Sequence, residues 1–260
     1  MIRLSVVIIS FNAQKHIGKC LDSVQGIADD IVVLDCFSTD STFEICRVRG
    51  ARVIQHPFLG YSAQKNLGLS FAQFPHILSL DADEWLSPGL RDSIGRVKLA
   101  WDRDGYWVDR LNFYCGKWIR HGSWYPDRKL RIFDSRKGYW GGTYVHERFI
   151  LSSGGKTGKL KGKLMHQAYH SIPEHLEKMG RYSRLSAQSM RARGRKASWF
   201  RLFFSPKVAF LKSYLVKLGF LDGWRGLVIA SMIAYGTLLK YALLRDGDCP
   251  ATGNGASSPP

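Results

Sequence analysis

The sequence has few cysteines, and none of them lies in a paired arrangement. The five cysteines, at positions 20, 36, 46, 115 and 249, are widely spaced and include no Cys-x-x-Cys pair. An odd and scattered set of cysteines fits neither a disulfide framework nor a zinc ribbon. The cysteines therefore predict a chain that works in a reducing cytoplasm.

The first apolar run is followed by no glycine. Residues Leu4–Ile9 lead into Ser10-Phe11-Asn12-Ala13-Gln14, whereas a dinucleotide-dependent oxidoreductase needs a glycine-rich turn at this place. The run is also too short for the apolar region of a signal peptide, and no small-residue cleavage site follows it. We therefore expect the start of the chain to be a buried strand, and we set the oxidoreductase class aside.

Acidic residues are scarce in the second part of the chain. Residues 1–100 carry 10 Lys/Arg and 10 Asp/Glu, whereas residues 101–260 carry 28 and 11, an excess that equals the whole net charge of +17. Nucleic acid, phospholipid headgroups and phosphorylated glycolipids would each match this charge. The charge predicts an anionic partner, and motifs have to choose among the three.

The first hundred residues alternate short β-rich runs with helix-like segments. This order is typical of βαβ units and predicts a parallel sheet. With 260 residues and 45% hydrophobic content, the chain is long enough for one full core with appended helices. The expected strands are Leu4–Ile9, Ile31–Leu34, Val53–Gln55 and Ile77–Leu80, and the expected helices are Ala13–Val24, Ser41–Arg49 and Ser62–Phe71.

The later residues change character twice. Residues 105–150 interleave aromatic residues with Gly and Arg, which predicts an antiparallel extension with long loops. From Pro173 the pattern is helical, and the aromatic and basic residues 199–207 suit a helix in a membrane interface. Residues 226–244 are apolar for about the length of a bilayer span, but their small residues also suit a docked or embedded helix. The tail from Gly247 is expected to be disordered.

Three carboxylates follow the fourth expected strand, at Asp81, Asp83 and Glu84. Their mutual repulsion calls for a cation, and a divalent ion such as Mg²⁺ or Mn²⁺ binds carboxylates while keeping positions for diphosphate oxygens. The alternative is that the cluster caps a helix that begins at Ser87-Pro88. A second acidic strand end favours the metal and nucleotide interpretation.

That second acidic end is the segment DCFSTDST at residues 35–42. Asp35 is placed to accept from a nucleobase or ribose, while Asp40 either binds ligand or caps the following helix. Ser10 and Asn12 are expected to line the same nucleotide pocket. Lys65 is a candidate for contact with a phosphate, although a solvated helix lysine is the commoner outcome.

These motifs resemble the inverting family 2 glycosyltransferases with a GT-A fold, in particular bacterial lipopolysaccharide-core heptosyl β-1,4-glucosyltransferases. The resemblance covers nearly the whole chain and implies a Rossmann-like α/β fold. In it, a mixed and mainly parallel sheet is flanked by helices and followed by a C-terminal membrane-associated helical extension. The resemblance is carried by LSVVIISFNAQKHIGKCLDSV (4–24), IVVLDCFSTDST (31–42), GYSAQKNLGLSFA (60–72), ILSLDADEWLSP (77–88), YPDRKLRIF (125–133) and YVHERF (144–149).

The resemblance also implies roles for single residues. Asp35 resembles the aspartate that recognises the nucleoside, and Asp81-Ala82-Asp83 resembles the motif that binds the metal and the diphosphate, with Asp83 as the direct ligand. Cys36 stands where the family often has a serine. The implied cofactor is therefore a divalent metal, and the implied donor is a nucleotide diphosphate sugar.

An inverting transfer needs a base for the acceptor hydroxyl. Glu147 matches a His-Glu element of the family and is the first candidate, with Asp127 as the second. The alternatives are a salt bridge from Glu147 to a neighbouring arginine, and for His146 either a core position or a place as third metal ligand. The nearby basic residues Arg128, Lys129 and Arg131 are candidates to hold either the diphosphate or a phosphorylated acceptor.

We therefore predict a catalytic domain at 1–170, a membrane-associating helical extension at 171–246 and a disordered tail at 247–260. Within the first, residues 1–100 bind the nucleotide sugar and 101–170 face the acceptor. The expected reaction moves a hexose such as glucose from a UDP-sugar to a glycolipid or oligosaccharide acceptor such as lipopolysaccharide core.

The expected location is the cytoplasmic face of the inner membrane, peripheral or monotopic, with an anionic membrane surface and no nucleic acid as partner. The alternatives are a membrane scaffold or a nucleic-acid-binding protein without catalysis. A nucleic-acid-binding protein would not explain the acidic strand ends, and a scaffold predicts that Asp83→Asn leaves the behaviour of the protein unchanged. A dehalogenase-like phosphatase ranks lower, because its Asp-x-Asp follows the first strand.

Overall fold

The computed structural model describes residues 1–142 and 147–246, which form two compact units. Of the described residues, the first unit contains 1–110, 128–142 and 147–166, and the second contains 111–127 and 167–246. Two of the three boundaries fall within the long strands β6 (Gly105–Tyr114) and β11 (Thr157–Tyr169).

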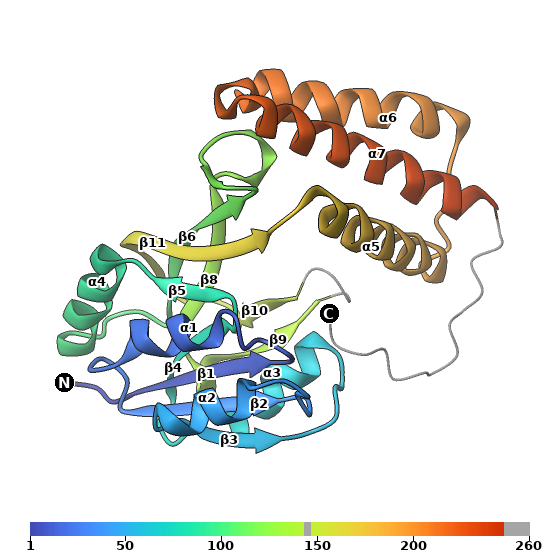
Figure 1. Ribbon diagram of the computed structural model, residues 1–260. Coiled ribbons are helices and arrows are strands. Elements are labelled where there is room, and N and C mark those ends of the chain that lie inside the picture. Colours follow the sequence, from blue (N-terminus) through green and yellow to red (C-terminus); the bar gives the residue numbers. More distant parts are fainter. Residues whose placement is uncertain (143–146, 247–260) are drawn as a thin grey trace. The chain divides into compact units, whose positions relative to one another are not determined.

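The first unit begins with a parallel βαβ arrangement (Figure 1). The strands lie in the order β3-β2-β1-β4, and each neighbouring pair is parallel. The predicted parallel sheet is therefore confirmed. Its elements are β1 (Leu4–Ser10), α1 (Ile17–Val24), β2 (Asp30–Asp35), α2 (Thr42–Val48), β3 (Arg52–Gln55), α3 (Tyr61–Ser70) and β4 (His76–Asp81).

The first helix starts later than the sequence predicts. The predicted helix begins at Ala13, whereas α1 begins at Ile17. The backbone N–H groups of Ala13 and Gln14 donate to side-chain oxygens of Thr42 and Asp40, at 2.7 Å and 3.1 Å. These bonds to the next loop hold the chain in a turn, because side-chain acceptors compete with helical hydrogen bonding.

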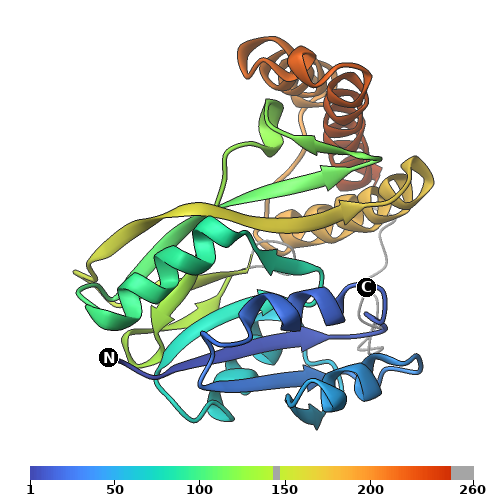
Figure 2. The same cartoon turned by 60° about the vertical axis from the view of Figure 1, so that its left-hand side comes forward.

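The sheet continues beyond β4 with antiparallel strands, as predicted for residues 105–150 (Figure 2). The order is β4-β8-β6-β11-β5, with β7 paired to β6, and β9 and β10 form a separate hairpin. Ser87 caps α4 by accepting from the N–H of Leu90 at 3.3 Å. The remaining elements are β5 (Glu84–Leu86), α4 (Pro88–Leu99), β7 (Lys117–Ile119), β8 (Asp127–Asp134), β9 (Gly138–Gly141) and β10 (Arg148–Leu151).

The central strand β1 is buried on both faces, as a parallel strand between helices should be. Val6 and Ile8 belong to a core cluster with residues of α1 and α4, whereas Val7 belongs to a second cluster with Phe133 and Trp140. Gly68 of α3 approaches this second face so closely that a Cβ there would lie 2.7 Å from Val7 Cγ1. Packing against these two clusters fixes the position of the carboxyl end of β1.

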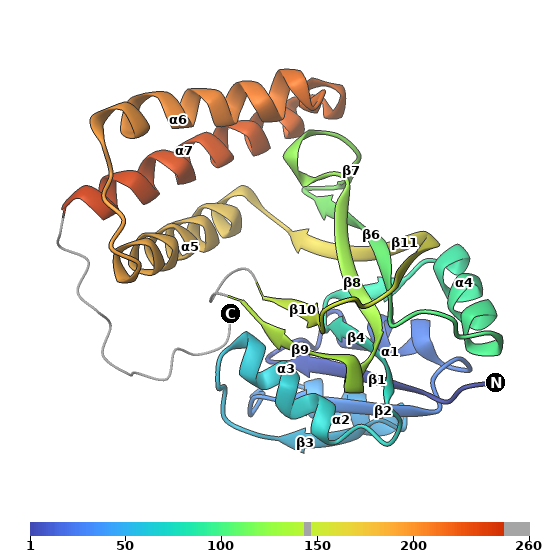
Figure 3. The ribbon, with the colours of Figure 1, turned by 180° about the vertical axis from the view of Figure 1, so that it is seen from behind.

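The second unit is mainly helical. It contains α5 (Ile172–Ala192), α6 (Trp199–Leu211), a π-helical turn (Lys212–Val216), a 3-10 turn (Gly219–Asp222) and α7 (Trp224–Asp246). Figures 1 and 3 show α7 lying between α5 and α6, and α7 contacts both. The helices predicted from Pro173 onward are confirmed, and α7 is a candidate membrane-associated helix.

Candidate active site

The parallel register brings the predicted polar residues to one edge of the sheet. Ser10 at the end of β1 pairs with Asp35 at the end of β2, and Ile9 pairs with Asp81 at the end of β4. Ser10 Oγ donates to Asp35 Oδ1 at 3.0 Å. Ligands of open α/β sheets bind beyond the carboxyl ends of such strands, so this edge is the candidate active site.

The loops that follow β1 and β2 are joined by hydrogen bonds. The N–H of Asn12 donates to Ser38 Oγ at 2.9 Å, and the N–H of Thr39 donates back to Asn12 Oδ1 at 2.8 Å. Asp40 Oδ2 accepts from the N–H of Gln14 at 3.1 Å. Asn12 has a φ of 46°, in the left-handed region that asparagine tolerates better than most residues. The two loops therefore form one connected rim.

Asp40 has a structural role at the start of α2. Its Oδ1 accepts from the N–H of Thr42, the first residue of the helix, at 3.0 Å. Burial raises the pKa of Asp40, but hydrogen bonds from Thr42 and Gln14 outweigh it and lower the pKa below its ordinary value. Of the two roles open for Asp40, the geometry favours the helix-capping type.

Asp35 is fully buried, and its oxygens are taken up by the chain itself. They accept from Ser10 Oγ, from the N–H of Ser38 at 2.9 Å and from Ser38 Oγ. Next to it, Cys36 Sγ accepts from Gln64 Nε2 at 3.2 Å. Burial, together with the charge of Asp35, raises the pKa of Cys36 to about 11, so the thiol is neutral at physiological pH.

Lys65 is not the solvated lysine that is commonest on a helix, because it is 2% exposed. Its Nζ lies 2.8 Å from Asp81 Oδ1 and 3.4 Å from Glu147 Oε1. Arg131 of β8, also buried, contacts the other oxygen of Asp81. Burial raises the pKa of Asp81, but Arg131 and Lys65 outweigh it and hold the pKa well below its usual range.

Glu84 is a structural residue of this site. It is fully buried, and its Oε1 accepts from Arg131 Nη2 at 2.8 Å and from Arg110 Nη1 at 3.0 Å. Its Oε2 accepts from the N–H of Asp81 at 3.1 Å. Lys65, Arg110 and Arg131 therefore compensate the charges of Asp81 and Glu84 from within the chain.

The side chain of Asp83 is 36% exposed, compared with 26% for Asp81 and 0% for Glu84. Its Oδ2 lies 3.6 Å from His166 Nε2 on β11. Burial raises the pKa of Asp83, but His166 outweighs it, so the net shift is downward. Sequence reasoning missed His166, which lies 83 positions along the chain and carries no motif. Among residues 1–142 and 147–246, no group of three or more His, Cys, Asp or Glu side chains is placed to hold a metal ion.

The two candidate bases lie in different places. Glu147 is 22% exposed, and its Oε1 lies 3.4 Å from Lys65 Nζ. Asp127 is the half-buried first residue of β8 and belongs to the second unit. His146 lies outside the described residues. Ala82 is buried in the core cluster, so its side chain is turned away from ligand.

The family model described as glycosyl transferase family 2 matches residues 5–150. The chain belongs to glycosyl transferase family 2. It is 30% identical over 256 residues to a glycosyltransferase of Rickettsia prowazekii, covering 95% of this chain and 88% of that one. It is 28% identical over 254 residues to the lipopolysaccharide core biosynthesis glycosyltransferase LpsC of Rhizobium meliloti, covering 92% and 93%.

These matches confirm the resemblance seen in the motifs, the GT-A-like fold and the assignment to transferase enzymes. The solved structure of Staphylococcus aureus TarS, residues 1–349, superposes with a TM-score of 0.46 at 14% identity, covering 94% of this chain and 90% of that one. That likeness is too loose for any functional comparison.

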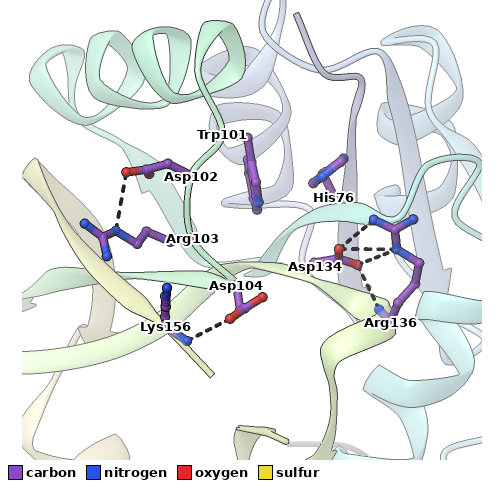
Figure 4. Close-up of a pocket in the computed structure, with 8 residues that line it drawn as sticks. All are labelled: His76, Trp101, Asp102, Arg103, Asp104, Asp134, Arg136 and Lys156. Atoms are coloured by element: carbon purple, nitrogen blue, oxygen red, sulfur yellow. Dashed lines mark hydrogen bonds and ion pairs between the residues drawn. The ribbon is translucent and has the colours of Figure 1, made fainter. Parts of the chain in front are cut away.

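This family 2 glycosyltransferase also has a cavity at the amino end of β4, the end opposite Asp81 (Figure 4). Its volume is about 320 Å³. Asp134 pairs with Arg136 at 2.7 Å, and Asp102 pairs with Arg103 at 3.4 Å. Both carboxylates are paired with arginines, and the cavity lies at the amino end of β4 rather than at the carboxyl end where ligands of such sheets bind. We therefore assign no catalytic role to the cavity. Its lining residues are His76, Trp101, Asp102, Arg103, Asp104, Asp134, Arg136 and Lys156.

Proposed function

We propose that this glycosyltransferase transfers a hexose from a UDP-sugar, with inversion, to a lipopolysaccharide-core acceptor at the cytoplasmic face of the inner membrane. The observation that carries the proposal is the arrangement of Asp81, Asp83 and Glu147 around Lys65 and His166 at the carboxyl edge of the sheet. The similarity to LpsC, whose name gives lipopolysaccharide core biosynthesis, supports the acceptor class.

The donor would lie across the ends of β1, β2 and β4. The joined rim of Asn12 and Ser38 supplies a wall whose backbone is already ordered, so little entropy is lost when the nucleoside binds. Ser10 and Asp35 lie beneath this wall and set its position. Ala82 would contribute backbone contacts alone, since its side chain is buried.

The residues present fit a divalent metal at Asp83 better than at Asp81. Both oxygens of Asp81 face fixed cations, Lys65 and Arg131, which would repel a metal ion. Asp83 is partly exposed, and its carboxylate oxygens are ligands that suit Mn²⁺ and Mg²⁺. When bound, the ion neutralises the charge that develops on the departing diphosphate.

Glu147 is the proposed base. It takes the proton of the acceptor hydroxyl as that oxygen attacks the anomeric carbon, and the bond from that carbon to the diphosphate breaks on the opposite face. Glu147 and Asp81 both contact the ammonium of Lys65, which supports a base close to the proposed donor motif. Asp127 is the second candidate for this role.

The second unit would bring the enzyme to a lipid-anchored acceptor. Helix α7 is long and apolar enough to cross a membrane, and 17% of its most apolar 18-residue stretch is buried. A helix from the core of a soluble protein would be mostly buried. The excess of Lys and Arg in the second part of the chain complements anionic headgroups.

The proposal is tested by calorimetric binding of UDP and GDP, each with and without Mn²⁺. We expect metal-dependent binding of UDP that is lost in Asp83→Asn. Asp92→Asn is the matched control, because Asp92 is an exposed aspartate on α4 of the same unit. Binding of GDP alone would contradict the donor class, and binding of neither nucleotide to the folded protein would contradict the transferase assignment of this edge.

A further inference from the structure

One face of α7 is covered by a charged helix. Ser183 Oγ of α5 donates to the carbonyl of Gly236 at 3.2 Å, and Arg191 of α5 donates to the carbonyl of Leu243 at 2.9 Å. A Cβ at Gly236 would lie 3.2 Å from Met179 Cγ, so the two helices cross closely. Because α5 carries many charged side chains, it is not stable when surrounded by hydrocarbon. The charged residues of α5 include Glu174, Glu177, Lys178, Arg181, Arg184 and Arg191.

The other side of α7 is covered by α6, whose residues are all described and none of which is buried. Six of its large apolar side chains are 48% to 69% exposed. They are Trp199, Phe200, Phe203, Phe204, Val208 and Leu211. Helix α7 thus lies between a charged helix and an apolar one, which is the arrangement of a helix docked parallel to an interface rather than one surrounded by lipid.

Residues 212–224, which connect α6 to α7 and include the first residue of α7, form an exposed apolar segment that we name the hairpin tip. Six of its large apolar side chains are 44% to 76% exposed, so the segment carries a group of exposed apolar residues rather than an isolated one. Leu218 has a φ of 57°, a strained value for leucine. The exposed side chains are Leu215, Val216, Leu218, Phe220, Leu221 and Trp224.

The hairpin tip is held in place from within. Asp222 is 3% exposed, and it accepts from the N–H groups of Arg120 and His121 at 3.0 Å and 2.8 Å. The N–H of Gly122 donates to the carbonyl of Lys217 at 2.8 Å. Burying the carboxylate of Asp222 and straining the backbone of Leu218 both cost free energy. This cost keeps the apolar side chains of the hairpin tip exposed to water, which indicates that another surface covers them in function.

Cations accompany the apolar side chains. Lys212 and Lys217 of the hairpin tip are exposed, as is Arg120 in the loop that hydrogen-bonds to it. Lys117 of β7 is half-exposed, and its Nζ lies 3.8 Å from Asp222 Oδ1. Each lysine or arginine near an anionic bilayer contributes about 1 kcal/mol of attraction. Apolar side chains with cations nearby match a membrane leaflet whose headgroups are anionic.

We propose that the hairpin tip and α6 bind one leaflet of an anionic bilayer and that α7 does not cross it. This proposal rests on the membrane association in the proposed function and specifies its residues and its depth.

The first test is flotation of the full chain with vesicles of phosphatidylcholine alone or with phosphatidylglycerol. We expect binding that depends on phosphatidylglycerol and falls about tenfold or more in Val216→Glu, because a valine contact is lost and a charge is repelled. Val48→Glu is the matched control, since Val48 is 79% exposed on α2 of the first unit, close to the 76% of Val216. Flotation of Val216→Glu equal to that of the wild type would overturn the proposal.

The second test measures depth. A fluorescent label is placed at Val216→Cys or at Tyr235→Cys, a half-exposed position in the middle of α7, in a parent with Cys115 and Cys249 replaced by serine. Lipids with a nitroxide at a shallow or a deep carbon then quench the label. We expect shallow quenching at 216 and no deep quenching at 235, whereas strongest quenching at 235 by the deep nitroxide means that α7 spans.

A second copy of the chain is the other occupant to be tested. If the hairpin tip were a dimer contact, Val216→Glu would lower the mass of the protein in lipid-free solution and leave flotation unchanged, which would overturn the proposal. The outcome is separable from the proposed function, because Asp83→Asn should still float with vesicles and Val216→Glu should still bind UDP with Mn²⁺.

Discussion

The first unit buries charged side chains, whereas the second exposes apolar ones. Lys65, Glu84 and Arg131 are almost completely excluded from solvent in the first, while Phe200 and Val216 of the second are more than two-thirds exposed. Charges fixed in a protein interior need no rearrangement when a charged substrate arrives, so they suit catalysis. Exposed apolar groups suit a partner that removes water. The contrast suggests a division of roles, in which the first unit carries the catalytic residues and the second unit contacts the partner that sets the location of the enzyme.

The largest effect should come from the first unit. Asp83→Asn should lower the rate of sugar transfer about a thousandfold, because loss of a metal ligand removes several kcal/mol of stabilisation from the departing diphosphate. Transfer is measured with radiolabelled UDP-sugar and an oligosaccharide acceptor, and circular dichroism checks folding. A folded Asp83→Asn protein with wild-type rates would contradict this assignment, and Asp92→Asn should be unchanged.

Glu147→Gln should lower kcat about a hundredfold or more while the binding of UDP changes little, as expected for loss of a general base. Rapid-quench kinetics and calorimetry separate the two effects. Asp127→Asn is the comparison variant. If Asp127→Asn abolishes transfer and Glu147→Gln does not, the base is Asp127 and the pairing with Lys65 is structural.

Arg131→Met should lower the free energy of unfolding by about 3 kcal/mol, because it leaves the buried carboxylate of Glu84 with one partner fewer. Arg47→Met removes an ion pair whose side chains are 70% and 62% exposed, so it should change stability by about 0.5 kcal/mol or less. Urea unfolding followed by tryptophan fluorescence gives both values. Equal effects of the two variants would mean that the buried network contributes no more than a surface pair.

Acid should destabilise the second unit through His175. Burial lowers the pKa of His175 from 6.5 to about 4, so the unfolded chain binds a proton that the folded chain does not. That stability is complete above pH 6.5 and is lost as the pH falls toward 4, by up to about 3 kcal/mol. The lowered pKa of Asp81 acts only below its ordinary 3.8. Near-ultraviolet circular dichroism should change between pH 6.5 and 4 in the wild type, and less in His175→Gln.

The sequence predicts the parallel half well, because its signals are local. Alternating apolar runs and turn residues mark β1, β2 and β4, and parallel pairing then brings Ser10, Asp35 and Asp81 to one edge without further information. Helix α4 likewise begins at the Ser87-Pro88 signal. These features depend on residues that are close in the chain.

The rest of the site depends on contacts that no local pattern encodes. Arg131 lies 47 positions from Glu84. In the sequence it is one of three nearby basic residues, with Arg128 and Lys129, and nothing marks it as the buried partner of Glu84. His166 meets Asp83 only because β11 pairs with β5 in an antiparallel register. Antiparallel registers depend on turn geometry, so the cations and the histidine were not predictable in their roles.

The ammonium of Lys65, shared by Asp81 and Glu147, couples the two halves of the reaction. In the proposed function, a diphosphate near Asp81 would compete for the same positive charge that Glu147 faces, so donor binding would change the electrostatic field at the proposed base. Thermodynamic linkage makes such an effect reciprocal for binding, so the acceptor would alter donor affinity by the same factor. One lysine would thereby link the affinities of the enzyme for its two substrates.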